Sequence, residues 1–204
     1  MGNLLENNQV TLVGEVVSDF QFSHELFGEG FYTFEVAIAR TSNFVDYIPV
    51  IVSERLIDIK TDIKGCFVCV NGQYRSFNKH EESRSKLILS AFAIDIEVLD
   101  SNDYEVVNNV FLDGYVCKEP VYRKTPHGRE ITDLIIAVNR GYGKSDYIPC
   151  ICWGRNARFA QAFEVGTHVQ ICGRVQSRPY LKKISDTEVE ERVAYEVSVS
   201  KIEL

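Results

Sequence analysis

Aromatic and cationic side chains gather in the second half of this 204-residue sequence. Tyr147 and Trp153 lie six residues apart in one apolar, strand-like stretch, so both rings are expected to face the same side. Tyr142 precedes this stretch, and Tyr180 follows a later one. Basic residues surround these rings in the sequence: Arg140, Lys144, Arg155, Arg158, Arg174, Arg178, Lys182 and Lys183. Such a set suits a single strand of nucleic acid, because bases stack on rings while cations follow the phosphates. The alternative is that the rings belong to a hydrophobic core.

The sequence shows no recognisable catalytic site or metal-binding site. The four histidines have no Ser, Cys or Asp partner at a recognisable spacing, and the carboxylates of Asp186, Glu188, Glu190 and Glu191 are scattered. A metal-dependent nuclease would need clustered carboxylates for its metal ion. Cys66 and Cys69 resemble half of a zinc site, but no second Cys/His pair lies at ligand spacing. We therefore expect no enzymatic activity, no catalytic residue, no metal and no cofactor, and plain reduced thiols at all six cysteines.

The charge of the chain is unevenly distributed. The net charge is −7, with a net of −9 over residues 1–105 and +2 over residues 106–204. Because phosphate binding depends on Lys and Arg, a nucleic-acid-binding face is expected mainly in the second half. No apolar run reaches the roughly 18 residues that span a bilayer, and no secretory signal opens the chain. We expect a soluble, cytoplasmic protein without a membrane partner.

The sequence contains an internal repeat. A shift of 100 residues places Asp46-Tyr47-Ile48-Pro49 on Asp146-Tyr147-Ile148-Pro149, and it gives 13 identities across positions 10–55. With a shift of 101 the similarity continues through Gly72 and Gly173. Each copy is long enough to bury its own core. We therefore predict two domains, 1–105 and 106–204, joined by the polar stretch 100–105.

Each copy reads as a series of strands. In the first copy, alternating or β-branched segments lie at 10–17, 31–40, 45–52, 66–75 and 86–99, and residues 54–60 are a weak candidate for a helix. The second copy repeats this order, with strands near 109–116, 130–140, 145–153, 167–178 and 192–203 and a better helix at 156–164. Three strands, a helix and two strands form the layout of the five-stranded OB barrel. The predicted fold is all-β with short helices, as two tandem OB folds related by duplication.

The first copy has fewer of the candidate binding residues. Ser53 stands where the second copy has Trp153. The residues that it offers are Tyr47, Phe77, Arg40 and Arg55. With its acidic balance we expect it to be the weaker binder, serving dimerisation or protein contacts instead.

Residues 108–204 resemble bacterial single-stranded DNA-binding proteins. The resemblance rests on an aromatic opening strand three (Tyr147), Trp153 before Gly-Arg, the series Gly-x-x-Val-x-Ile-x-Gly-x-Val over 166–175, and a basic run closed by Tyr180. It is weaker but collinear over 8–99. The resemblance implies base-stacking roles for Tyr147, Trp153 and Tyr180, and for Tyr47 and Phe77 in the first copy.

The resemblance also implies an assembly. Many proteins of that family carry one OB domain and form tetramers, so two domains in one chain would give four barrels as a homodimer. The family's acidic-tipped tail is not seen in the sequence, which stops within the last predicted strand, so recruitment of partners through such a tail is not expected.

Two functions from different classes remain open at this point. The first is sequence-independent binding of single-stranded DNA in replication, recombination or repair, with RNA as another ligand because stacking accepts either sugar. The second is an accessory OB-fold protein of the replication-restart type, docking replication or repair proteins through the acidic first copy.

Overall fold

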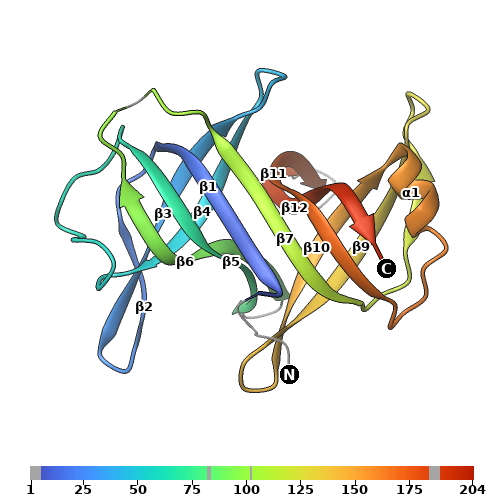
Figure 1. Ribbon diagram of the computed structural model, residues 1–204, viewed down its shortest axis with the longest axis horizontal. Helices are drawn as coiled ribbons and strands as arrows, with labels where there is room; N and C mark the ends of the chain where they lie inside the picture. Colours follow the sequence, from blue (N-terminus) through green and yellow to red (C-terminus); the bar gives the residue numbers. More distant parts are fainter. Residues whose placement is uncertain (1–5, 82–83, 102, 184–188) are drawn as a thin grey trace.

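Two β-barrels lie side by side in the computed structural model, which describes residues 6–81, 84–101, 103–183 and 189–204 (Figure 1). The first barrel contains six strands: β1 (Asn8–Val16), β2 (Gln21–Leu26), β3 (Glu29–Ala39), β4 (Val45–Ser53), β5 (Phe67–Glu81) and β6 (Arg84–Val98). The second contains β7 (Val107–Val116), β8 (Val121–Lys124), β9 (Glu130–Arg140), β10 (Lys144–Trp153), helix α1 (Gly154–Ala160), β11 (His168–Lys183) and β12 (Val189–Glu203).

The twelve strands of the described residues form one continuous sheet, in which equivalent strands of the two copies lie at the same distance from the centre. The order is β2-β3-β4-β6-β5-β1-β7-β11-β12-β10-β9-β8, so that β1 and β7 join the two barrels at the centre. These two strands are antiparallel, and Val10 lies directly opposite Val110. The two valines are equivalent in the 100-residue repeat, so the halves are related by a pseudo-twofold axis at this pair, as in a symmetric dimer joined into one chain.

A glycine in each copy explains how each barrel closes. Strand β1 pairs with β5 and, at its end, with β3, while β7 pairs with β11 and β9. A Cβ on Gly14 would lie 2.5 Å from the carbonyl oxygen of Ala37, and one on Gly114 would lie 2.5 Å from that of Ala137. Glycine therefore occupies the same position in both copies, Gly14 and Gly114, because the first and third strands of each barrel cross closely there.

The core of each barrel follows the alternation along its strands. Leu12, Leu112, Ile48 and Ile148 are fully buried, and so are other residues at the same alternate positions. Cys150 and Cys152 lie on the inner side of β10 and pack as small apolar residues, as expected for reduced thiols. Within the described residues no group of three or more His, Cys, Asp or Glu side chains could hold a metal ion.

The structure corrects the sequence predictions in three places. Residues 54–60 form turns, not a helix, because Asp58 accepts hydrogen bonds from the Lys60 N–H and the Thr61 hydroxyl in place of a helical arrangement. Each barrel has an additional short strand, β2 or β8, which forms a hairpin with the next strand. The fourth and fifth predicted strands of each copy are longer than expected and form extended hairpins, so Tyr180 lies within β11.

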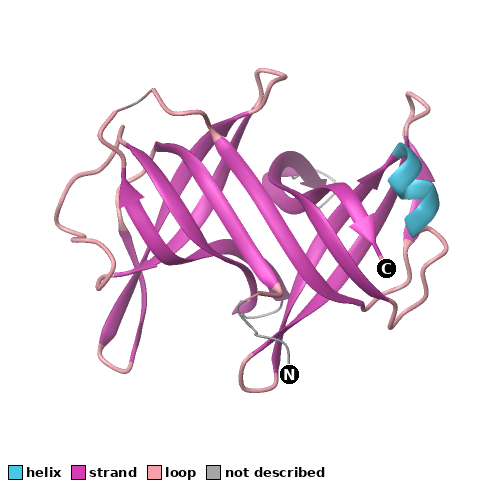
Figure 2. Cartoon of the chain, in the orientation of Figure 1, coloured by secondary structure: helices cyan, strands magenta, loops and turns pink. Residues whose placement is uncertain are grey.

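The helix expected at 156–164 occupies Gly154–Ala160 and packs on the second barrel, as Figure 2 shows. The Thr132 hydroxyl of β9 donates a hydrogen bond of 2.8 Å to the Ala157 carbonyl. Residues 99–101 and 103–106, between the barrels, form no helix or strand. Among the described residues, no helix has the length and apolar character needed to cross a membrane. Asp186, Glu188 and the side chain of His80 lie outside what the structure describes.

Candidate nucleic-acid interface

A groove of about 770 Å³ runs along the second barrel and is completed by the first; we call it the second groove. Its floor includes Ile131 and Ile151, which are nearly buried. Five arginines line it: Arg40, Arg123, Arg129, Arg174 and Arg178. Glu196 is the acidic residue of the lining. The lining is therefore cationic, although the whole chain is acidic.

Aromatic rings stand in this cationic lining. Trp153 at the end of β10 is 37% exposed, and Phe44 of the turn between β3 and β4 is 43% exposed. The Arg40 guanidinium lies 4.7 Å from the centre of the Phe44 ring. Trp153 is therefore not a fully buried core residue, and it lines the groove.

Several of these arginines are held by carboxylates. Arg123 pairs with Asp133 at 2.8 Å, and Arg178 lies 3.8 Å from Glu196. Arg40 and Arg174 both approach the buried Asp46, which they reach from opposite halves of the chain. Burial and the nearby Arg40 lower the pKa of Arg174, against the opposing effect of Asp46, but a guanidinium remains charged at neutral pH.

The first barrel has an equivalent groove of about 510 Å³, the first groove. Ile51 and Ser76 occupy in it the places that Ile151 and Ser177 occupy in the second groove. Its cations are Arg75, Arg140 and Lys144, and its rings are those of His24, Phe31, Phe77 and Phe92. Among the residues that the structure describes, no carboxylate lines this groove. Its local charge is therefore positive, in contrast to the net −9 of residues 1–105.

The rings of the first groove are already stacked on neighbours. His24 and Phe31 are parallel at 4.9 Å between ring centres, and the Arg75 guanidinium lies 3.7 Å from the centre of Phe92. Burial and the neighbouring Arg140 lower the pKa of Arg75 to about 10, partly offset by Asp146. Phe77 is 46% exposed. This groove therefore offers less uncovered aromatic surface than its number of rings suggests.

The two halves exchange residues between the grooves. Arg140 and Lys144, expected to act with Trp153, line the first groove. Arg40, expected to serve the first copy, lines the second groove together with Trp153, Arg174 and Arg178. The hairpin between the third and fourth strands of each barrel reaches the groove of the other. The sequence prediction grouped these residues by copy, and the structure groups them differently.

The other predicted residues lie on the surface outside the two groove linings. Tyr47 and Tyr147 are 48% and 46% exposed, Tyr180 is 36% exposed, and Tyr142 projects fully into solvent at a turn. The Tyr147 N–H donates a hydrogen bond of 2.7 Å to the Ser76 hydroxyl, which places this residue where the two barrels meet. Arg55 pairs with Glu29 at 3.3 Å. The remaining basic residues lie on α1 and at the end of β11: Arg155, Lys182 and Lys183.

Sequence reasoning missed Arg123, Arg129 and Phe44. Arg123 lies on β8, a strand that was not predicted, and Arg129 lies in the turn that follows it. The sequence did contain a sign of this hairpin, because the basic stretch of residues 123–129 lies between Tyr122 and Ile131, and such residues are typical of flanking strands. For Phe44 no local signal exists, because its groove belongs to the other half of the chain.

The second half of the chain is similar to a known protein family. The model of the single-strand binding protein family matches residues 107–204. Single-stranded DNA-binding protein A of Bacillus subtilis is 34% identical over 82 residues, which cover 37% of this chain and 48% of that protein. Single-stranded DNA-binding protein 1 of Lactococcus lactis is 33% identical over 82 residues, covering 37% of this chain and 55% of that protein. The chain thus spans about half the length of the curated relatives it matches.

Solved structures are similar over both halves. The wild-type single-stranded DNA binding protein of Thermus aquaticus matches with a TM-score of 0.74 and 22% identity over 96% of this chain and 91% of that chain. A deletion mutant of the same protein matches with a TM-score of 0.76 and 20% identity over 96% and 93%. At this identity the likeness concerns the fold, and it extends the tandem OB arrangement to residues beyond the family match. Residues 107–204, just under half of the chain, match the single-strand binding protein family.

Proposed function

We propose that this protein binds single-stranded DNA without sequence preference, by stacking bases on exposed rings and by contacts between arginines and phosphates. The observation that carries the proposal is the second groove, where five arginines surround the exposed Trp153 and Phe44. Every base can stack on a ring, and contacts between arginines and phosphates carry no sequence information, so this set favours single strands of any sequence.

The proposal assigns the larger share of binding to the second groove. It combines five arginines with the exposed Trp153 and Phe44, whereas in the first groove His24 covers Phe31 and Arg75 covers Phe92, which leaves Phe77 as an exposed ring. The first groove still contributes phosphate contacts through Arg75, Arg140 and Lys144. The weaker binding expected of the first copy therefore follows from covered rings more than from its acidic composition.

The chain contains one tryptophan, and this residue reports on the second groove. Oligo-dT is titrated into the full chain while the emission of Trp153 is followed, with a duplex and an oligo-U RNA of equal length in parallel. We expect strong quenching by oligo-dT and little by the duplex, whose bases are already stacked with one another. Unchanged emission at saturating oligo-dT, with binding absent by an independent assay, contradicts the proposal. The RNA arm decides whether the sugar matters.

We propose in addition that two chains associate, giving an assembly of four OB folds. The pseudo-twofold pairing of β1 with β7 already joins two barrels within one chain, in the manner of a symmetric dimer. A homodimer of chains would then contain the four barrels that the family's tetramers contain. Light scattering of the full chain is expected to give about twice the 23.2 kDa of the monomer. A monomer at all accessible concentrations contradicts this part.

A further inference from the structure

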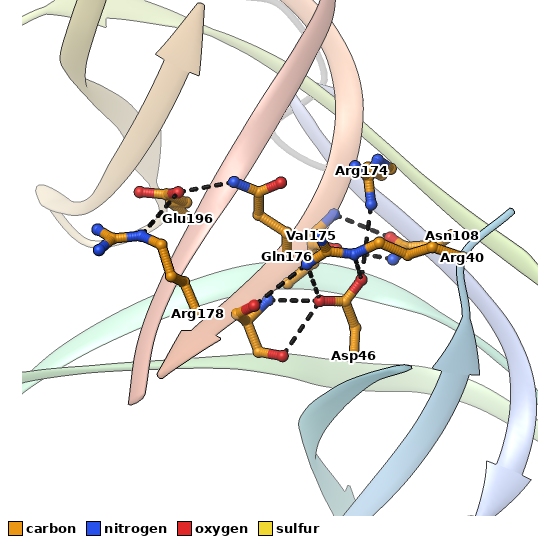
Figure 3. Close-up of polar contacts among 9 residues, drawn as sticks. Arg40, Asp46, Asn108, Arg174, Val175, Gln176, Arg178 and Glu196 are labelled. Atoms are coloured by element: carbon orange, nitrogen blue, oxygen red, sulfur yellow. Dashed lines mark hydrogen bonds and ion pairs between the residues drawn. The ribbon is translucent and has the colours of Figure 1, made fainter. Parts of the chain in front are cut away.

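A buried carboxylate joins the two halves beside the second groove (Figure 3). Asp46 of β4 has no exposed surface, and it accepts hydrogen bonds from the backbone N–H of Ser177 at 2.6 Å and from the Ser177 hydroxyl at 3.1 Å. Arg40 of the same hairpin donates to it through Nε at 2.6 Å. Arg174 of β11 lies 3.6 Å from its second oxygen. Asp46 therefore binds groups from both halves of the chain.

The guanidinium of Arg40 completes this link. Its Nη2 also donates a hydrogen bond of 3.1 Å to the backbone carbonyl of Ser177. The first half of the chain thus holds strand β11 at Ser177 in two ways. Asp46 accepts a hydrogen bond from the Ser177 N–H, and Arg40 donates one to the Ser177 carbonyl. The arrangement imitates a backbone pair and fixes the hairpin of residues 40–46 against the opposite barrel.

The pseudo-twofold axis repeats the link with weaker contacts. Asp146 accepts a hydrogen bond of 2.9 Å from the Ser76 N–H, and Arg140 donates to it at 3.3 Å. Burial raises the pKa of Asp146, in spite of opposing effects from the Ser76 N–H, Arg140 and Arg75. The two links lie at equivalent positions, but the one at Asp46 has shorter hydrogen bonds.

The groups that Asp46 holds are groups of the second groove. Arg40, Arg174 and Ser177 all belong to the lining, and Arg40 in turn covers one face of Phe44. Without the carboxylate, two guanidinium groups from opposite halves would face each other without the charge that offsets their repulsion. The hairpin that carries Arg40 and Phe44 would then lose its fixed position at the groove.

We infer that Asp46 is a positioning residue for nucleic-acid binding in the second groove, acting from the first half on a groove whose remaining residues come mostly from the second. Asp146 has the corresponding role for the first groove through Arg140. The inference rests on the proposed function, and it assigns to the first half an effect, through Arg40 and Arg174, on the strand bound beside Trp153.

The experiment compares three variants of the full chain. Asp46→Asn keeps the shape and an acceptor oxygen for Ser177 but removes the charge that holds Arg40 and Arg174. Asp146→Asn makes the same change at the equivalent buried position. Asp19→Asn removes an exposed carboxylate that is not part of either groove lining. The ligand is oligo-dT of about eight nucleotides, within the site size of one OB fold.

Binding is followed through quenching of Trp153. We expect Asp46→Asn to weaken this binding about tenfold, as loss of a charge-assisted network predicts, and Asp146→Asn and Asp19→Asn to change it less than about twofold. Thermal unfolding is measured for each variant as a control. If Asp46 had only a structural role, Asp46→Asn and Asp146→Asn would both lower the stability, and both would change the quenching of Trp153 to the same extent. Hydrogen exchange at the Ser177 amide, measured without DNA, is expected to rise in Asp46→Asn alone.

The outcomes separate the inference from the proposed function. If the unchanged chain is quenched by oligo-dT, but Asp46→Asn and Asp146→Asn weaken binding equally or not at all, the inference is overturned while the function stands. If the unchanged chain binds no oligo-dT, the proposed function is overturned and the inference falls with it. Faster exchange at Ser177 together with selective loss of quenching in Asp46→Asn supports the inference.

Discussion

Replacing Arg178 by Ala tests whether the arginines of the second groove neutralise phosphates. Arg178 is one of five arginines in the lining, and its side chain is 55% exposed. The side chain of Arg40 is only 20% exposed, whereas Arg129 and the side chains of Arg123, Arg174 and Arg178 are exposed, so we take these four as phosphate partners. With a slope of about −0.7 per phosphate on a single strand, four contacts give a log–log salt slope of about −2.8.

The slope converts into a measurable ratio. Between 50 and 200 mM salt, a slope of about −2.8 lowers the affinity about 50-fold, and a slope of about −2.1 lowers it about 20-fold. We expect the first value for short oligo-dT on the unchanged chain and the second for Arg178→Ala. The variant also leaves Glu196 beside the strand without Arg178, so its affinity at low salt falls further. Fluorescence titrations at four or more salt concentrations measure both quantities.

The control for Arg178→Ala is Lys201→Ala. Lys201 lies on β12, pairs with Glu203 at 2.8 Å and is not part of either groove lining. Its loss removes the same charge from the chain and is expected to leave the slope unchanged. An equal change of slope in both variants would show that overall charge, not a contact in the groove, governs the salt dependence. An unchanged slope in Arg178→Ala would remove this residue from the phosphate path.

Other predictions concern the ring, the thiols and the effect of pH. Trp153→Ala is expected to cost about 1–3 kcal/mol of affinity for oligo-dT, while circular dichroism shows a folded chain because the ring is partly exposed. In native protein at pH 8, iodoacetamide is expected to modify the exposed Cys172 and to spare the buried Cys150 and Cys152. Burial raises the pKa of Cys152 to about 12 and the pKa of Cys150 well above its usual range, so both thiols stay protonated at this pH. Mass spectrometry of the peptides measures the extent of modification. Burial raises the pKa of Asp146 above 3.8, so the folded state holds this proton more tightly than the unfolded chain, and the contribution of Asp146 to stability falls as the pH rises through the raised pKa. Chemical denaturation between pH 3 and 7 is expected to show a smaller fall over that window in Asp146→Asn, and parallel profiles in the two proteins would contradict the assignment.

Much of the fold was accessible from the sequence because the repeat is nearly collinear. Val10 matches Val110 and Gly14 matches Gly114, and these matches predict that the first strands of the two copies are equivalent. In the structure these strands, β1 and β7, lie at the centre of the sheet. Alternation of apolar residues identified the strands in both copies. The helix expected at 54–60 was wrong because side-chain hydrogen bonds of Asp58 favour a turn, a local competition that apolar patterning does not report.

The arrangement of the candidate site was less accessible. The types of residue were recognised, but not which half of the chain each one serves. Arg40 reaches the groove of the second barrel because Asp46 binds Ser177, a contact between residues 131 positions apart. Such packing between barrels leaves no periodic trace in the sequence. The covering of Phe92 by Arg75 and of Phe31 by His24 likewise depends on neighbouring strands in space.

Photo-crosslinking tests whether bases stack on the rings of the second groove, because thymine bases stacked on an aromatic ring form covalent adducts with it on ultraviolet irradiation. The full chain is irradiated with oligo-dT, digested and analysed by mass spectrometry. We expect a main adduct on Trp153, with weaker adducts in the first groove at the exposed Phe77. Adducts confined to exposed rings outside both grooves, such as Phe27 or Tyr104, would contradict it.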